Sequence, residues 1–147
     1  IRSVIESAML AEAVEKLTKR DLAVLQNTCN RMHAAIESMR KARMDIMTGK
    51  PESDFLDADI LFHLTLLRAS GNSLAEKIIV NAYRRNQFFG THSHQRTLEH
   101  VASAWKFHCE ITKACRAKNA ALAVKWLQDH IARSKNDALL PVSQVSA

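Results

Sequence analysis

Turn-forming residues are scarce in this sequence, which has three glycines and two prolines among its 147 residues. No stretch of useful length alternates polar and apolar side chains, and no internal repeat or low-complexity segment is found. Regular β-sheet is therefore disfavoured. The composition predicts one compact, mostly helical domain.

Long apolar runs are also missing. None approaches the ~18 residues that a membrane span needs, and no signal-peptide pattern opens the chain. With 47% hydrophobic residues the chain can build a packed core, which excludes a disordered tail. We expect a soluble protein with no membrane partner. Because Ile1 is not a methionine and the first residues already read as helix, we expect a segment of a longer protein.

Cysteine and charge add two further exclusions. Cys29, Cys109 and Cys115 form no C-x-x-C pair and are too few for a disulfide scaffold, which favours a reducing, cytoplasmic location. The net charge of +6 is basic, but the basic residues are scattered in clusters of two at most. With no basic strip and no recognisable reading helix, direct nucleic-acid binding by this segment is disfavoured.

Apolar residues at three-and-four spacing predict an all-α fold, an antiparallel bundle of about six helices. The second helix opens with a capping box, Thr18-x-x-Asp21, and we expect Gly49 and Pro51 to end it. Asn119 is expected to cap the last helix. The expected helices cover residues 1–17, 18–48, 52–69, 73–89, 96–118 and 120–135.

Four polar residues lie on the predicted inward faces of three helices. Asp59 and His63 are four residues apart, so they share one face of the third helix. His108 and His130 lie at the centres of the inward stripes of the fifth and sixth helices. His108 lies ten residues before Lys118 and His130 ten residues after Ala120. At ~1.5 Å per residue, the two histidines end level with each other across a helix hairpin.

This pattern has two interpretations. Each polar residue could be a hydrogen-bonded core residue, and the Asp59–His63 pair could be a simple intrahelical contact. Alternatively, a divalent cation would satisfy the carboxylate and the three neutral imidazoles together. Such mixed ligands suit zinc, our first choice, as well as nickel, iron or manganese. Four protein ligands on a six-coordinate ion would leave two adjacent positions for water or a chelating carboxylate.

The fourth helix supplies candidates for a second ligand contact. Its predicted inward stripe is Leu74, Ile78, Asn81, Ala82, Arg85, Phe88 and Phe89. Asn81 should lie beside the metal, and Arg85 one turn away could grip an anionic ligand. Arg84 is the reserve candidate. Equally, Arg85 could extend to solvent or pair with an acidic residue. The other histidines, His33, His92, His94 and His100, are predicted to lie outside the metal site.

Two motifs resemble a known family. Asp59-x-x-Phe62-His63-x-x-Leu66, followed by Ala69-Ser70-Gly71-Asn72-x-Leu74, is similar to the first motif of the FCD domain. The stretch His108-x-x-Ile111-x-x-Ala114, continuing to Asn119, Ala123 and His130-Ile131, is similar to the second motif. This is the C-terminal effector-binding domain of FadR-subfamily GntR transcription regulators. Phe107 and Asn119 depart from the usual acidic residues, although neither departure removes a metal ligand.

The resemblance implies a function for the whole chain, 1–147, as an effector-binding and dimerisation domain. It implies a metal bound by Asp59, His63, His108 and His130, with a small carboxylate metabolite beside it, such as a sugar acid, hydroxy acid or dicarboxylate. It further implies a homodimer and an N-terminal winged helix-turn-helix, absent from this chain, that binds operator DNA.

Our leading hypothesis is therefore a sensor domain, with no catalytic residue and no enzyme activity. One alternative is a metal-dependent hydrolase or lyase that uses the open metal. Against it, the inward stripes offer few further acid or base groups. The other alternative is a purely structural metal protein, which would have no affinity for small acids.

Overall fold

The computed structural model describes residues 1–89 and 96–139, with side chains for residues 1–85 and 96–137. These residues contain no β-strand beyond one isolated bridge between Ile46 and Thr97. The elements are α1 (Arg2–Lys16), α2 (Lys19–Lys41), α3 (Gly49–Ser70), α4 (Ser73–Phe89), α5 (Leu98–Arg116) and α6 (Ala120–Leu139). The predicted all-α bundle of about six helices is confirmed.

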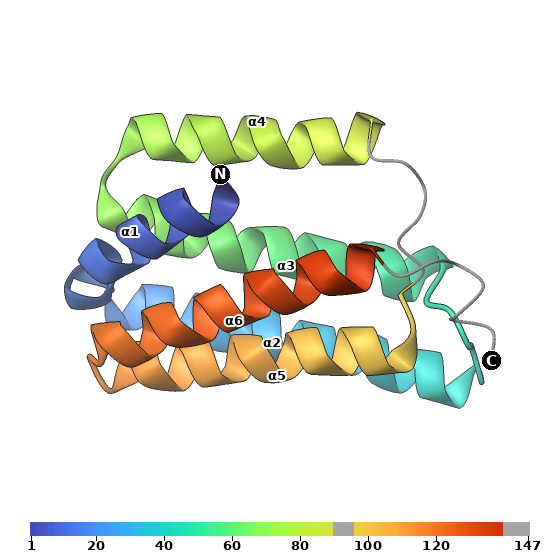
Figure 1. Ribbon diagram of the computed structural model, residues 1–147. Helices are drawn as coiled ribbons and strands as arrows, with labels where there is room; N and C mark the ends of the chain where they lie inside the picture. Colours follow the sequence, from blue (N-terminus) through green and yellow to red (C-terminus); the bar gives the residue numbers. More distant parts are fainter. Residues whose placement is uncertain (90–95, 140–147) are drawn as a thin grey trace.

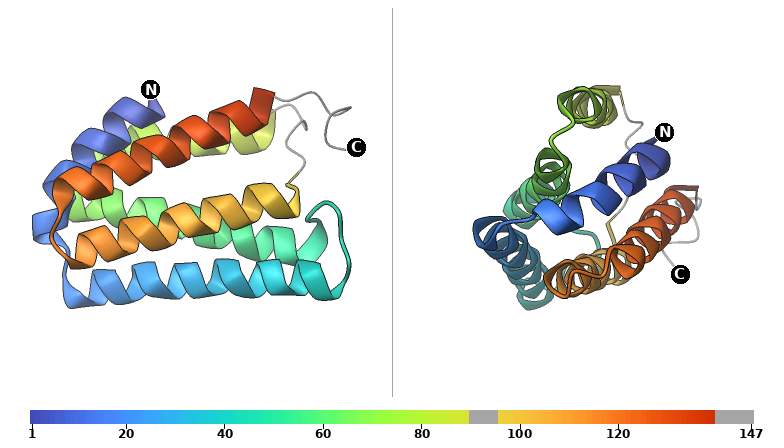
Figure 2. Two further views of the ribbon diagram at one scale, coloured as in Figure 1. Left: turned by 60° about the horizontal axis from the view of Figure 1, so that its bottom comes forward. Right: turned by 90° about the vertical axis from the view of Figure 1, so that its left-hand side faces the viewer.

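Five of the helices form a closed ring. Helix α1 packs on α3, α3 on α2, α2 on α5, α5 on α6, and α6 returns to α1. Helix α4 lies outside this ring and contacts α3 and α1 (Figures 1 and 2). No helix in the described ranges is long and apolar enough to cross a membrane. The ring encloses the main hydrophobic core. Asp59, His63, His108 and His130 lie on three of its helices.

Helix α2 forms as the sequence predicts but ends earlier. The Thr18 side chain accepts from the backbone N–H of Asp21 and the Asp21 side chain accepts from that of Thr18, which completes the capping box. The apolar stripe is buried through Met39, yet the helix stops at Lys41. The expectation that it continues to Gly49 is wrong, because Arg43 adopts a positive φ of 52° that is incompatible with an α-helix.

Gly49 and Pro51 begin α3 instead of ending α2. Proline is tolerated in a first helical turn because its missing N–H would have no partner there in any case. The preceding loop is anchored to the residues just before α5, because the Met47 N–H donates to the Arg96 carbonyl oxygen at 2.9 Å. The error in predicting where α2 ends and α3 begins does not affect Asp59 and His63, because both lie well inside α3.

Two helix breaks lie where the sequence predicts them, at Gly71 and Asn119, and they determine how far along the bundle each neighbouring helix begins. Gly71 ends α3 in the left-handed conformation (φ 79°), which glycine adopts without a Cβ clash. Asn119 separates α5 from α6, and its side chain accepts from the Leu122 N–H at 3.0 Å, as an N-cap does. The α5–α6 hairpin therefore turns where the sequence predicts.

The inward face of α4 differs from the predicted stripe. Leu74 and Ile78 are 67% and 41% exposed, whereas Ala75 and Ile79 are buried against Leu67 and Met9. The helix has two adjacent apolar rows, and its contact with α3 and α1 uses the row one residue later than expected. This rotation exposes Asn81, Arg84 and Arg85.

Candidate metal centre

Three helices of the ring bring four predicted ligands to one point. Asp59 and His63 come from α3, His108 from α5 and His130 from α6. One donor atom from each residue can be chosen so that all four lie within 4.8 Å of one another. The histidine rings of His108 and His130 have centroids 4.6 Å apart, so the hairpin does place them level. All three histidines are buried, and Asp59 is 23% exposed.

The protonation of His108 is set by the backbone of its own helix. Its Nδ1 lies 2.6 Å from the carbonyl oxygen of Ala104, and only a protonated Nδ1 can donate to that acceptor. In the neutral ring, Nε2 then carries a lone pair. Nε2 lies 3.0 Å from Asp59 Oδ1 without normal hydrogen-bond geometry, and a cation bound by both atoms would satisfy them together.

His63 is oriented by a residue that sequence analysis missed. Its Nδ1 lies 2.7 Å from Glu6 Oε2, a carboxylate of α1 that is 3% exposed. A carboxylate beside Nδ1 favours a proton on that nitrogen and leaves Nε2 for the centre of the cluster. Glu6 also accepts from Arg2 Nε at 2.8 Å, and another nitrogen of Arg2 donates to the Tyr83 hydroxyl at 2.6 Å.

The remaining imidazole nitrogens fit a metal. Buried His63 Nε2, His108 Nε2 and His130 Nδ1, like His63 Nδ1 beside Glu6, have no hydrogen bond of normal geometry to any described residue. Buried polar atoms are rarely left in this state. Three imidazole nitrogens and one carboxylate oxygen form an ordinary donor set for zinc and related divalent ions. The residues present therefore fit a divalent cation.

Electrostatics favour an ionised Asp59 and a neutral His130. Burial alone would raise the pKa of Asp59, but His108, His63 and His130 hold it far below its usual range. Burial and the neighbouring His108 and His63 lower the pKa of His130 well below its usual value. Burial opposes the ionisation of Glu6, yet His63 and Arg2 lower its pKa to about 2. Near neutral pH the cluster holds an ionised carboxylate and, at His130, a neutral imidazole.

Aromatic rings surround the cluster. Phe62 packs edge-on against His108, with ring centroids 4.4 Å apart. Phe107, which stands where the related motif has an acidic residue, lies 5.7 Å from the His130 ring and 6.1 Å from that of Trp126. The departure at Phe107 thus places an apolar ring, instead of a carboxylate, beside His130.

The other residues singled out in the sequence have different surroundings. Asn81, Arg84 and Arg85 are exposed on α4, so their predicted ligand-binding role stays a prediction. His33 is exposed and contacts the Trp105 ring at 4.8 Å. His100 Nε2 lies 3.6 Å from Asp137 Oδ1. His92 and His94 lie outside the described residues.

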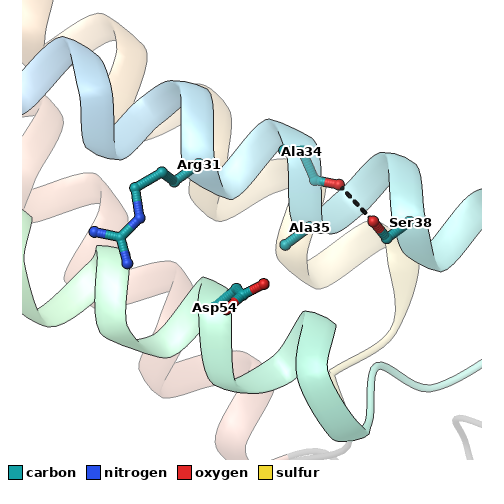
Figure 3. Close-up of a pocket in the computed structure, with 5 residues that line it drawn as sticks. All are labelled: Arg31, Ala34, Ala35, Ser38 and Asp54. Atoms are coloured by element: carbon teal, nitrogen blue, oxygen red, sulfur yellow. Dashed lines mark hydrogen bonds between the residues drawn. The ribbon is translucent and has the colours of Figure 1, made fainter.

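A hollow lies between α2 and α3 (Figure 3). Its volume is about 220 Å³, and it is lined by Arg31, Ala34, Ala35 and Ser38 of α2 and Asp54 of α3. The Ser38 hydroxyl donates to the Ala34 carbonyl oxygen at 3.1 Å, and Asp54 accepts from Lys50 at 2.6 Å. These polar groups are already partnered within their own helices, and none belongs to the metal cluster.

A six-helix bundle that gathers three histidines and an aspartate between its helices is the arrangement that the sequence motifs implied. The family model of the FCD domain matches residues 1–133, and the chain belongs to this family. A solved structure of E. coli McbR/YncC has the same fold, with a TM-score of 0.76 and 20% sequence identity. The match covers 93% of this chain and 63% of McbR/YncC. No curated protein matches the sequence.

Proposed function

We propose that the chain is the ligand-sensing domain of a GntR-type transcription regulator. In this proposal Asp59, His63, His108 and His130 bind a divalent metal ion, and a small organic acid binds beside it. The observation that supports this proposal most directly is the contact of His108 Nε2 with Asp59 Oδ1 at 3.0 Å. The other ring nitrogen, Nδ1, donates its proton to the Ala104 carbonyl oxygen. Membership of the FCD family supports a sensing role.

The bound ion would serve as a docking point for the acid. Four protein ligands leave two positions of a six-coordinate ion for a chelating carboxylate. Zinc is our first assignment, with nickel, iron or manganese as alternatives that the donor set accepts. We do not propose an enzyme, because Glu6, the acidic group added by α1, is already engaged by Arg2 and His63.

Regulation would act through a coupling between two sites. The chain spans 63% of the McbR/YncC chain, and we assign DNA binding to a winged helix-turn-helix domain outside this sequence, in a cytoplasmic homodimer. An acid that binds more tightly to one relative arrangement of the sensing domain and the DNA-binding domain shifts the equilibrium towards that arrangement. The affinity for operator DNA changes as a result.

Elemental analysis of the purified chain, followed by thermal unfolding with a panel of small organic acids, tests this proposal. We expect about one ion per chain, and at least one acid that raises the melting temperature in a concentration-dependent way. A metal-free chain whose stability does not change after chelation would overturn the metal site. A bound metal with no response to any acid would leave a structural metal protein. Metal-dependent turnover of an ester or carbonyl substrate would favour the hydrolase or lyase alternative.

A further inference from the structure

Two of the three cysteines lie against each other between α2 and α5. Cys29 of α2 is buried in the main core, and Cys109 of α5 packs against that core while staying half-buried. The two thiols shift each other's pKa, because contact with Cys109 lowers that of Cys29 and contact with Cys29 raises that of Cys109. The two residues are 80 positions apart in the sequence, so helix packing alone brings them together.

The register of the two helices accounts for this contact. Helices α2 and α5 pack side by side and run in opposite directions (Figure 2). The His33 ring lies 4.8 Å from the Trp105 ring. His33 is one turn after Cys29, and Trp105 is one turn before Cys109, so the same register places the two cysteines level with each other. Cys29 Sγ also lies 3.6 Å from the hydroxyl oxygen of Thr112, three residues after Cys109.

A disulfide fits between helices that pack in this way. The axes of packed helices lie ~8–10 Å apart, and each Cα lies ~2.3 Å from its own axis. Facing Cα atoms are therefore roughly 3.5–5.5 Å apart, which overlaps the ~4.4–6.8 Å that a disulfide requires. The bond can form by a turn of the two side chains, and the helices need not separate.

Cys115, the third cysteine, has different surroundings. It is fully buried on α5, and burial raises the pKa of its thiol to about 12. A buried thiol held in its neutral form is unreactive, because the thiolate is the nucleophile. Cys109 is half-buried, so a small oxidant can reach it from solvent. The accessible thiol thus lies beside a second thiol, an arrangement typical of redox-sensitive cysteines.

We infer that Cys29 and Cys109 form a reversible disulfide when the protein meets a hydroperoxide. In the first step a sulfur–oxygen bond forms as the O–O bond breaks, and the thiol proton leaves with the departing oxygen as water. In the second step the other sulfur attacks the sulfenic acid, the S–S bond forms and the S–O bond breaks, and a second water leaves. The peroxide is reduced, and each sulfur is oxidised by one electron.

The bond would join α2 to the helix that carries His108. Cys109 follows His108 directly, and the Thr112 hydroxyl donates to the His108 carbonyl oxygen at 2.9 Å. Neither thiol belongs to the cluster of candidate metal ligands, so the inference holds with or without a bound metal. Disulfides in reducing compartments are rare, and those that form there are usually transient and serve catalysis or redox sensing.

The experiment treats the purified chain with hydrogen peroxide, blocks the remaining thiols with iodoacetamide and maps the cysteines by mass spectrometry. Trypsin leaves each cysteine in its own peptide, because cleavage after lysine and arginine gives residues 21–31, 107–113 and 114–116. The variants are Cys29→Ser and Cys109→Ser, with Cys115→Ser as the matched control. Each protein is treated before and after metal removal with EDTA.

We expect the wild type to fall from three free thiols to one, with peptides 21–31 and 107–113 joined. Dithiothreitol should restore all three thiols, and Cys115→Ser should form the same link. Cys29→Ser offers no second thiol to an oxidised Cys109, so the sulfenic acid should persist and react with dimedone. Cys109→Ser should leave the buried Cys29 unmodified.

Four results would overturn the inference. Three free thiols after treatment would mean that the pair does not react. Sulfinic acid at Cys109 without the link would mean that Cys29 cannot reach it. A link that includes Cys115 would show that the observed packing does not select the pair. A link that forms only before EDTA treatment would assign the oxidation to a bound metal. Should Cys29→Ser fail to fold, Cys29→Ala takes its place.

Discussion

His108 contacts Asp59 with one ring nitrogen and its own helix with the other. Nε2 lies 3.0 Å from Asp59 Oδ1, while Nδ1 lies 2.6 Å from the Ala104 carbonyl oxygen. The backbone contact is available because residues four apart in a helix lie one turn apart. In the neutral ring, helix α5 itself thus fixes the tautomer that leaves a lone pair on Nε2.

Replacing His130 with alanine should remove the metal. His130 is the candidate ligand on α6, so its loss leaves three candidate ligands from two helices. We expect the metal content to fall from about one ion per chain to near zero after dialysis, and acid binding to be lost with it. His33→Ala, at an exposed histidine, is the control and should keep its metal. An acid that still binds normally to metal-free His130→Ala would contradict the coupling of the two sites.

Chelation should destabilise the wild type by a predictable amount. An ion present at 100 to 1,000 times its dissociation constant contributes about 3–4 kcal/mol. For a chain of this length the melting temperature should therefore fall by about 5–15 °C when EDTA is added. Thermal unfolding followed by circular dichroism measures the change. Metal-free His130→Ala should show no shift with EDTA, and an equal shift in both proteins would mean that EDTA acts elsewhere.

The clustering of Asp59, His63, His108 and His130 could be predicted because the position of each residue depends on local rules. Asp59 and His63 share a face by helical spacing, and the N-cap at Asn119 sets the level of His108 against His130. Both rules act within one helix or one hairpin, so periodicity and capping suffice. The same holds for the capping box of Thr18 and Asp21.

Glu6 and Arg2 could not be predicted in this way. Glu6 lies 57 positions before His63 in the sequence, and its contact exists only because α1 packs against α3. One signal was available. Arg2 and Glu6 are four apart and flank apolar residues near the start of a helix, so two charges share one face of an otherwise apolar segment. The prediction of the buried face of α4 was wrong for another reason. This helix has two adjacent apolar rows, and the sequence gives no basis for choosing which one is buried.

Replacing Glu6 with glutamine should weaken the metal site without removing a ligand. The Glu6 carboxylate lies beside His63 Nδ1 and orients the ring. Loss of such an outer partner typically costs about 10- to 100-fold in metal affinity. Competition with a chromogenic chelator measures this change. Glu12→Gln, at an exposed carboxylate on the same helix, should have wild-type affinity. Equal losses in both variants would indicate a general effect of charge.

Two N-cap threonines should differ in their contribution to stability. The Thr18 hydroxyl accepts from the Asp21 N–H at 3.1 Å, whereas Thr48, the N-cap of α3, makes no such bond. Thr18→Ala should therefore lower the free energy of unfolding by about 1 kcal/mol, and Thr48→Ala should change it far less. Urea unfolding of both variants measures the difference. A cost at Thr48 equal to that at Thr18 would show that capping is not the cause.

Acid should destabilise the metal-free protein in two separate ranges. The folded pKa of His130 is well below its usual value, because burial and the other two histidines oppose its charge. As the pH falls through about 6.5, the unfolded chain takes up a proton that folded His130 does not, so the free energy of unfolding decreases. For Glu6, with a folded pKa of about 2, the stabilisation is present above about pH 4 and is lost as the pH falls further.

Urea unfolding of the EDTA-treated chain as a function of pH separates these contributions. Between about pH 7.5 and pH 5 the free energy of unfolding should fall less steeply in His130→Gln than in the wild type, because the variant has no imidazole to protonate on unfolding. Glu6→Gln should keep the wild-type slope in that range and lose part of the slope below about pH 4. An unchanged slope in His130→Gln would mean that His130 is protonated in the folded, metal-free state, which its packing between His108 and His63 opposes.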